Sequence, residues 1–278
     1  MEFNHKPVLL KECIDGLNIR EGKIYVDGTL GGAGHSIEIA KKLNNTGLLI
    51  GIDRDLEAIE ASKQRLKDFT NIKFVNNNHD NVQQILQDLK IDKVDGILLD
   101  LGVSSHQIDE EARGFSYIKD AELDMRMDKN QELTAKYIIN NYKEEELARI
   151  IYEYGEERYS RQIAKKICEE RKKIEIKTTK QLVQIIENAI PEFAKHKEGH
   201  PAKRTFQAIR IEVNNEIKPL YDTVINSIKA LNPGGRLCII TFHSLEDRCV
   251  KNAYMDALRK MYMPKGHTIL CMWQRKAR

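Results

Sequence analysis

The sequence predicts an α/β protein in which a parallel sheet is interrupted by an inserted helical domain. Within the first hundred positions, four short apolar runs bounded by turn residues alternate with segments of helical spacing. The runs cover residues 24–28, 47–53, 72–76 and 94–100. This alternation is typical of a parallel sheet that is covered by helices on both faces. After residue 107 the sequence becomes charged and helix-favouring, which indicates the insertion.

The spacing of apolar residues also predicts the order of the remaining elements. Helices are expected at 37–43, 56–66 and 82–89 between the strands, and at 144–152, 161–167 and 179–190 in the insertion. A long helix over 204–231 should stop at the "NPGG" of residues 232–235 and lead into a strand at 236–242, with 267–273 as a further strand candidate. We therefore expect the first part of the sheet domain at 1–106, a helical substrate-recognition insertion at 107–203, and the second part of the sheet domain at 204–278.

Composition excludes several classes of protein. The longest apolar runs are far shorter than the roughly 20 residues of a membrane helix, and the N-terminal residues lack an export signal, so we expect a cytoplasmic protein without a membrane partner. Five cysteines without CxxC spacing predict neither a disulfide framework nor a four-thiolate zinc site. His196 and His200 are four residues apart but have no third ligand nearby, so no metal is expected. The net charge of +3 gives only a faint indication of a nucleic-acid partner.

A glycine-rich loop, "VDGTLGGAGHS" at residues 26–36, follows the first expected strand. Such loops let a ligand touch the backbone at a helix N-terminus, and Asp53, nineteen residues after Gly34, can accept hydrogen bonds from ribose hydroxyls. The glycines do not form a clean GxGxxG, which favours S-adenosylmethionine over a nicotinamide dinucleotide, and Asp27 is expected to meet its ammonium group. The alternatives are a dinucleotide oxidoreductase and a purely structural turn.

The turn "DLGVSS" follows the fourth expected strand, at the edge where ligands bind in open α/β sheets. An exocyclic amine is a poor nucleophile, so it must be held in line with the methyl group while acceptors draw its N–H groups. The candidates for this catalytic role are the carboxylate of Asp100 and the carbonyls of Leu101 and Gly102. Alternatively, Ser104 or Ser105 starts a helix as its cap.

Several motifs together resemble those of the bacterial small-subunit ribosomal RNA methyltransferase H family, also called MraW. They are "HKPVLL" at residue 5, "DGTLGGAGHS" at 27, "DRD" at 53, "LLDLGVSS" at 98, "RGFSY" at 113, "LDMRMD" at 123, "YGEER" at 154, "HPAKRTFQAIRIEVN" at 200 and "FHSLEDR" at 242. The resemblance covers about nine tenths of the chain. It implies a Rossmann-like S-adenosylmethionine-dependent methyltransferase fold with an inserted helical domain. It also implies N4-methylation of a cytosine in the decoding (P-site) region of 16S rRNA in the small ribosomal subunit.

The resemblance also implies which residues bind the methyl donor. They are Ala33, Gly34, His35, Asp53, His79, Asp100 and Gln107. His79 stands where the family usually has an aromatic residue, so the adenine contact would be made by an imidazole. The chain ends without the family's basic tail, which leaves a second hypothesis open: an RNA-binding ribosome assembly factor that is weakly active or inactive.

The basic motif at residues 200–210 is a candidate RNA contact. Lys203, Arg204 and Arg210 can bind phosphates, whereas Phe206 fits the core better than a stacked base. His243, after the last strand, is a candidate proton acceptor, with Ser244 as an alternative helix cap together with Asp247. The oligomeric state stays open, a homodimer included.

Overall fold

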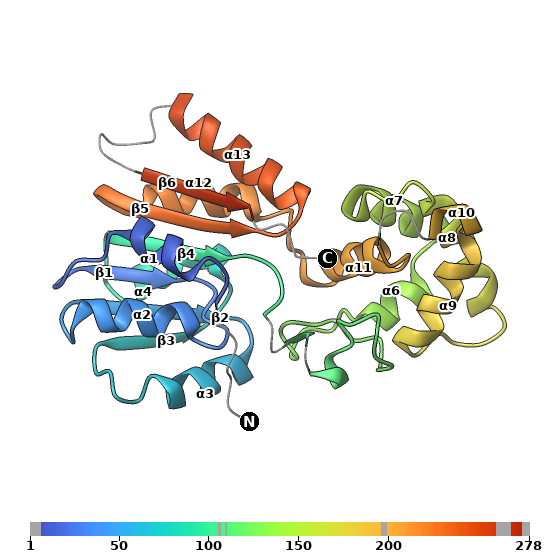
Figure 1. Ribbon diagram of the computed structural model, residues 1–278, viewed down its shortest axis with the longest axis horizontal. Helices are drawn as coiled ribbons and strands as arrows, with labels where there is room; N and C mark the ends of the chain where they lie inside the picture. Colours follow the sequence, from blue (N-terminus) through green and yellow to red (C-terminus); the bar gives the residue numbers. More distant parts are fainter. Residues whose placement is uncertain (1–6, 105–106, 109, 196–198, 260–267, 274–278) are drawn as a thin grey trace. The chain divides into compact units, whose positions relative to one another are not determined.

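The computed structural model describes residues 7–104, 107–108, 110–195, 199–259 and 268–273, which divide into two compact units (Figure 1). One unit consists of the chain up to Gly102 together with the chain from Ile217 onward, and the other is the segment from Val103 to Glu216. The chain therefore leaves the first unit once and returns to it. This organisation is that of a domain with an insertion.

The first unit is built on a parallel sheet with the strand order β3-β2-β1-β4-β5-β6. Its strands are β1 (Ile24–Asp27), β2 (Leu48–Asp53), β3 (Ile72–Asn76), β4 (Val94–Asp100), β5 (Leu231–Thr241) and β6 (Thr268–Trp273). The strand order reverses between β1 and β4, and such a switch point is where ligands bind in doubly wound sheets. The expected strands are confirmed, including the candidate near the C-terminus.

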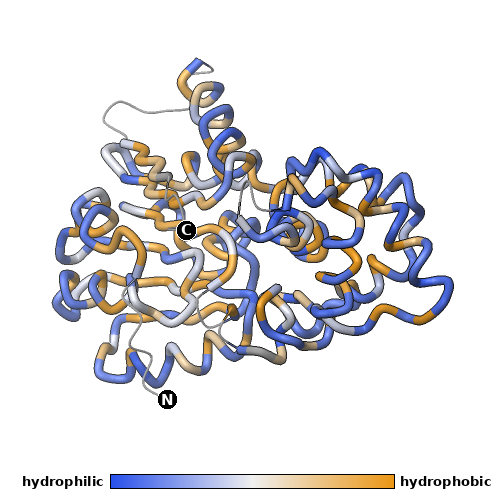
Figure 2. Tube along the Cα trace, turned by 45° about the vertical axis from the view of Figure 1, so that its right-hand side comes forward, coloured by the Kyte–Doolittle hydropathy of each residue, from blue (hydrophilic) through white to orange (hydrophobic). Residues whose placement is uncertain are grey.

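Helices cover both faces of this sheet. They are α1 (Leu10–Leu17), α2 (Gly34–Leu43), α3 (Leu56–Arg65), α4 (Val82–Asp88), α12 (Leu220–Lys229) and α13 (Ser244–Arg259), with the short turn η1 (His79–Asn81). Neighbouring strand residues enter different cores, as the pleat requires: Leu98 packs with α1, α2 and α3, whereas Leu99 packs with α4, α12 and α13. Figure 2 shows the hydrophobic runs of the strands between the more hydrophilic helices.

The second unit is helical and has a hydrophobic core of its own. Its helices are α6 (Ala135–Asn141), α7 (Glu144–Gly155), α8 (Ser160–Arg171), α9 (Thr179–Ala189), α10 (Glu192–Lys195) and α11 (Lys203–Asn214), with the turn η2 (Glu111–Arg113). Ile150, Ile163, Leu182 and Phe206 are buried together in this core, which confirms the expected burial of Phe206. Helices α6, α7, α8, α9 and α11 form here because each has an apolar stripe that packs into this core.

The helix expected over 204–231 is wrong, because two helices occupy this range. Helix α11 ends at Asn214 and is capped by Asn215, which has the left-handed φ of 50°, and α12 begins only after Pro219. The "NPGG" segment does not end a helix either, since it lies within β5, whose pairing with β4 shifts register between Val94 and Gly96. The local sequence favours helix over the whole range 204–231. The helix is broken at residues 215–219 because the chain passes there from the core of the helical unit to the core of the first unit.

The unit boundaries also differ from those expected at 107 and 203. Val103 already belongs to the helical unit, and so does all of α11, because Phe206, Ile209 and Val213 pack into the helical core. Helices α1 and α6 were not anticipated from the sequence. Among the described residues, no helix has the length and apolar character needed to cross a membrane.

Candidate functional site

Three acidic residues end neighbouring strands at one edge of the sheet. Asp27 ends β1, Asp53 ends β2 and Asp100 ends β4, and β1 pairs in parallel with both of the other strands. Because parallel strands bring their carboxyl ends to the same edge, these side chains gather around the switch point between β1 and β4. The glycine loop between β1 and α2 lies at the same edge.

Asp27 is hydrogen-bonded to the glycine loop and to the first turn of α2. Its carboxylate accepts hydrogen bonds from the Thr29 backbone N–H (3.2 Å) and from the Ser36 hydroxyl (2.7 Å), and the residue is 1% exposed. Burial raises the pKa of this carboxyl, an effect that nearby His35 opposes. Both carboxylate oxygens accept hydrogen bonds within the fold, and the expected contact with an ammonium group stays a prediction.

Asp53 fastens the same loop to the end of β2 while remaining partly exposed. Its carboxylate accepts hydrogen bonds from the backbone N–H groups of Gly31 (2.7 Å) and Asp55 (2.9 Å). Burial raises the pKa of Asp53 to about 6. Each carboxylate oxygen has two lone pairs, so this residue can also accept hydrogen bonds from the hydroxyls of a ribose.

The glycine loop reaches α2 through two left-handed residues, Gly31 with φ 47° and Ala33 with φ 59°. Ala33 is the N-cap of α2 and is buried. A Cβ atom on Gly34 would lie 2.3 Å from Cγ of Pro7, so glycine is required here by the close approach of the N-terminal segment. The loop thus presents backbone at a helix N-terminus, a setting that suits an adenosyl or amino-acid ligand.

His35 is buried in the first turn of α2 and lies between two other segments of the first unit. Its Nε2 atom is 3.0 Å from the Val8 carbonyl oxygen, and its Nδ1 atom is 3.9 Å from Oδ2 of Asp100. The ring has little exposed surface, and its contacts lie within the fold. A role for its side chain in direct donor contact stays a prediction.

His79 follows β3 and lies against the turn after β1. A Cβ atom on Gly28 would lie 3.2 Å from Cβ of His79, and Nε2 of His79 is 3.4 Å from a carboxylate oxygen of Asp80. Burial lowers the pKa of His79 to about 4, so the imidazole is neutral at pH 7. A neutral, flat ring at this position suits stacking on an adenine.

Asp100 is fixed by its backbone and exposes part of its side chain. Its N–H donates to Oγ1 of Thr29 (2.7 Å), and its side chain is 26% exposed. The next N–H, that of Leu101, donates to the Ile240 carbonyl (3.1 Å), and Gly102 has φ 86°, a conformation that favours glycine. The chain therefore turns sharply just after Asp100.

Ser104 and Gln107 belong to the helical unit and bond to each other. The Ser104 N–H donates to Oε1 of Gln107 (3.1 Å), and the Gln107 N–H donates to Oγ of Ser104 (3.2 Å). This reciprocal pair is a capping box, which supports the alternative that Ser104 starts a helix. Ser105 lies outside the described residues. A donor contact by Gln107 stays a prediction.

His243 lies just beyond β5 and is buried beside Glu246. The Glu246 backbone N–H is 3.4 Å from Nδ1 of His243, and Oε1 of Glu246 is 3.1 Å from Nε2. The other oxygen of Glu246 accepts from the Phe242 N–H (2.7 Å). Both ring nitrogens thus face Glu246, an arrangement that fits a helix cap, and the role of His243 as a proton acceptor stays a prediction. The capping residues are His243 and Glu246 rather than the expected Ser244 and Asp247.

The three basic residues expected to bind RNA differ in their surroundings. Lys203 is exposed at the start of α11. Arg204 donates from Nη1 to the Glu156 carbonyl (3.0 Å). Arg210 makes a two-point ion pair with Glu216, at 2.9 and 2.8 Å, so its charge is already balanced. Lys203 is therefore the best placed of the three to meet a phosphate.

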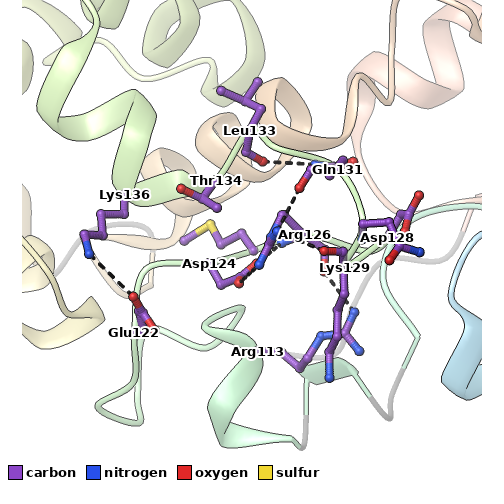
Figure 3. A network of polar contacts seen from close by, with 12 residues as sticks. Arg113, Glu122, Asp124, Arg126, Asp128, Lys129, Gln131, Leu133, Thr134 and Lys136 are labelled. Carbon is purple, nitrogen blue, oxygen red and sulfur yellow. Dashed lines mark hydrogen bonds and ion pairs between the residues drawn. The ribbon is translucent and has the colours of Figure 1, made fainter.

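The "LDMRMD" segment forms a polar network within the helical unit (Figure 3). Arg126 binds both carboxylate oxygens of Asp124 and the carbonyls of Lys129 and Gln131. Arg113, which is buried, donates to the carbonyls of residues 126 and 127. These guanidinium groups stabilise an irregular segment. No local sequence pattern shows that these two arginines stabilise the fold in this way.

Within the described segments, no cluster of three or more histidine, cysteine, aspartate or glutamate side chains could hold a metal ion. The residues that sequence reasoning missed are Thr29 and Ser36, which bond to Asp100 and Asp27. Both lie inside the motif "DGTLGGAGHS", but only the fold brings their hydroxyls to these acids.

Comparisons with known proteins show which family the chain belongs to. The family model described as the MraW methylase family matches residues 2–278. Two curated relatives named ribosomal RNA small subunit methyltransferase H, from Clostridium botulinum strains 657 and Kyoto, are 57% and 56% identical over 270 residues, which is 97% of this chain and 87% of each relative.

Similar solved structures include an rRNA methylase from Streptococcus thermophilus, with a TM-score of 0.29, 13% identity, and coverage of 44% of this chain and 72% of that one. Another is an S-adenosylmethionine-dependent O-methyltransferase from Thermotoga maritima, with a TM-score of 0.29, 14% identity, and coverage of 35% and 37%.

The residues at the sheet edge fit S-adenosylmethionine. The partly exposed Asp53 offers acceptors for ribose hydroxyls, the neutral ring of His79 can stack on adenine, and the loop after β1 presents backbone. The chain belongs to the MraW methylase family and is a methyltransferase that uses S-adenosylmethionine.

Proposed function

We propose that this protein methylates the exocyclic N4 atom of one cytosine in the decoding (P-site) region of 16S rRNA. The observation that carries the proposal is the carboxylate of Asp100, which is partly exposed at the end of β4 beside the glycine loop. The names of the relatives, which specify small-subunit ribosomal RNA, support the substrate class. The reaction would take place on small ribosomal subunits in the cytoplasm.

The chemistry of the amine explains why an acid is needed at this position. The lone pair of a cytosine amino group is delocalised into the ring, so the nitrogen becomes nucleophilic only when its N–H groups are drawn toward acceptors. S-adenosylmethionine, when bound, supplies an electrophilic methyl group. Asp100 would accept one N–H, and the carbonyls of Leu101 and Gly102 are the candidates for the other. The bond from carbon to sulfur would break as the bond to nitrogen forms, which leaves S-adenosylhomocysteine, and the proton that the nitrogen then loses would pass by way of the Asp100 carboxylate to solvent. Orientation and preorganised charge supply the rate enhancement, and no covalent intermediate is required.

The helical unit supplies a surface suited to RNA. A hollow of about 60 Å³ within it is lined by aromatic and basic side chains, among them Arg158, Tyr159, Phe193, His200 and Arg204. Phe193 is 67% exposed, and His200 stacks on Tyr117 with ring centroids 4.6 Å apart. Aromatic faces with nearby cations are what unpaired nucleotides bind, so we assign rRNA recognition to this unit.

The test is methyl transfer to isolated small subunits that lack the modification. With labelled S-adenosylmethionine, the label should appear in N4-methylcytidine and map to a P-site fragment of 16S rRNA. Asp100→Ala should lower the rate about 100-fold or more, the size expected when a preorganised acceptor is removed. Asp68→Ala, which alters an exposed acid in the same unit, is the matched control.

Two results would count against this function. Label in a different nucleoside would refute the cytosine assignment while leaving the methyltransferase intact. Subunits that bind to the protein but acquire no label, although calorimetry shows bound methyl donor, would instead favour the RNA-binding assembly factor.

A further inference from the structure

A buried histidine connects the candidate catalytic acid to the N-terminal segment. The ring of His35 lies between the Val8 carbonyl oxygen, 3.0 Å from Nε2, and the carboxylate of Asp100, 3.9 Å from Nδ1. The residue is only 6% exposed. All three groups belong to the first unit, in which α2, β4 and the segment before α1 meet.

The partners of the ring determine how its nitrogens are used. A carbonyl oxygen can only accept, so Nε2 of His35 carries a proton and donates a hydrogen bond to the Val8 carbonyl oxygen. Nδ1 is then the atom that faces Asp100, at a distance beyond a hydrogen bond but within electrostatic range. Asp27 is the other carboxylate that acts on His35, and Cys13 of α1 is close enough to both acids for their charges to affect its thiol.

The N-terminal segment is in turn packed against the glycine loop. The Pro7 ring occupies the space where a Cβ atom on Gly34 would lie, 2.3 Å from its Cγ. Leu9 adopts a left-handed φ of 49° before α1 begins, a conformation that costs energy in a bulky residue and needs surrounding contacts to hold it. The bond from His35 to Val8 is one such contact.

We propose that His35 is a positioning residue for methyl transfer, which acts through Asp100 on one side of its ring and through Val8 on the other. The edge of the ring at Nδ1 occupies the space beside Oδ2 of Asp100 and so excludes carboxylate orientations that turn toward the ring. The Nε2 side keeps the segment from Pro7 to Leu9 against the glycine loop and so preserves the shape of the methyl-donor site. The part that concerns Asp100 rests on the function proposed above.

Two conservative substitutions separate these effects. In His35→Gln the amide nitrogen can occupy the place of Nε2 and still reach Val8, while the group that faces Asp100 is lost. In His35→Asn the amide can occupy the place of Nδ1 beside Asp100, while the bond to Val8 is lost. We expect His35→Gln to keep affinity for S-adenosylhomocysteine within about threefold and lower kcat about tenfold. His35→Asn should weaken that affinity about tenfold with a smaller loss of kcat.

Three measurements test this assignment. Calorimetry with S-adenosylhomocysteine gives the affinities, single-turnover kinetics on small subunits give the rates, and nitrogen–proton correlation spectra of the imidazole report which ring nitrogen carries the proton. Lys11→Ala, which removes an exposed ion pair on α1, is the control for general effects near the N-terminus. The spectra should show a proton on Nε2 of His35 both in the free protein and in the complex.

The proposal is overturned if both variants lose affinity and rate in the same proportion. It is also overturned if the spectra show a proton on Nδ1 of His35 and none on Nε2. The spectra and the affinities do not depend on RNA. If they follow the expectation while the wild-type protein modifies no cytosine, the proposed function fails and the link between His35, Val8 and the donor site stands.

Discussion

The backbone N–H of Gly31 donates a hydrogen bond of 2.7 Å to Oδ2 of Asp53, so one carboxylate shapes the glycine loop and is also the acceptor that we expect the ribose hydroxyls to use. Asp53→Ala removes both contributions and should weaken binding of S-adenosylmethionine more than tenfold, because hydrogen bonds to a charged group contribute about 1.5–3 kcal/mol each. Asp53→Asn keeps an acceptor for Gly31 and should lose less. Isothermal titration calorimetry measures both, with exposed Asp68→Asn as the control.

Acidification should weaken binding of the methyl donor through Asp53. Its pKa is about 6, so the carboxylate is ionised at pH 7.5 and becomes protonated as the pH falls below 6. The protonated acid is a poorer acceptor for ribose hydroxyls, and affinity should fall between pH 7 and pH 5. The same titration in Asp53→Asn should be flatter over this range. Equal slopes for the two proteins would assign the pH dependence to another group.

Protein stability should show the opposite trend from the same residue. Because the pKa of Asp53 in the folded protein lies above 3.8, the folded state holds a proton between about pH 4 and pH 6 that the unfolded state has released. The contribution of Asp53 to the free energy of unfolding is therefore present below pH 4 and is lost as the pH rises to 6. In urea unfolding at several pH values, the free energy of unfolding should decline less between pH 4 and pH 6 for Asp53→Asn than for the wild type.

Gly28→Ala should destabilise the first unit by about 1–3 kcal/mol. The new Cβ atom would lie 2.5 Å from Cδ2 of Leu99 and 3.2 Å from Cβ of His79, so the turn after β1 would have to move. Urea denaturation measures the loss. The double variant Gly28→Ala with Leu99→Val should lose less stability than the two single changes added together, because the shorter side chain relieves the closest contact. Strict additivity would show that this contact is not the cause.

Asn214→Ala should destabilise the helical unit by about 2–4 kcal/mol, because it leaves buried backbone groups without partners. The amide of Asn214 accepts from the Met127 N–H (2.8 Å) and donates to the Met125 carbonyl (2.8 Å). Asn141→Ala, in which an exposed amide bond to Tyr137 is lost, should change stability by less than about 0.5 kcal/mol. Similar losses in the two variants would contradict a special role for Asn214.

The basic residues of α11 should respond differently in RNA binding. A plot of log affinity against log salt concentration has a negative slope, and Lys203→Ala should make that slope shallower by about one, because one phosphate contact releases about one counterion. Arg210→Ala should leave the salt slope nearly unchanged and lower stability instead, since Glu216, with its side chain 6% exposed, would lose its ion-pair partner. Filter binding over a salt series, together with urea unfolding, distinguishes the two outcomes.

The sequence by itself determined the parallel sheet, the glycine loop with Asp53, and the presence of a helical insertion. These features depend on local patterns: apolar runs that end in acids, glycines before a helix, and a change from alternating to continuous helical spacing. The motifs likewise sufficed to recognise the family. The same local signals failed at residues 215–219, because a helix-favouring segment was broken where the chain leaves one hydrophobic core for the other.

Only the tertiary structure decided what each polar side chain does at the site. Asp27 and Asp53 both end strands, yet one is buried under Ser36 and the other remains partly exposed. Arg210 is paired with Glu216, and the ring of His243 lies beside the Glu246 carboxylate. The physical reason is that burial and hydrogen-bond partners depend on which segments meet in space, and those segments are brought together by packing rather than by their separation along the chain.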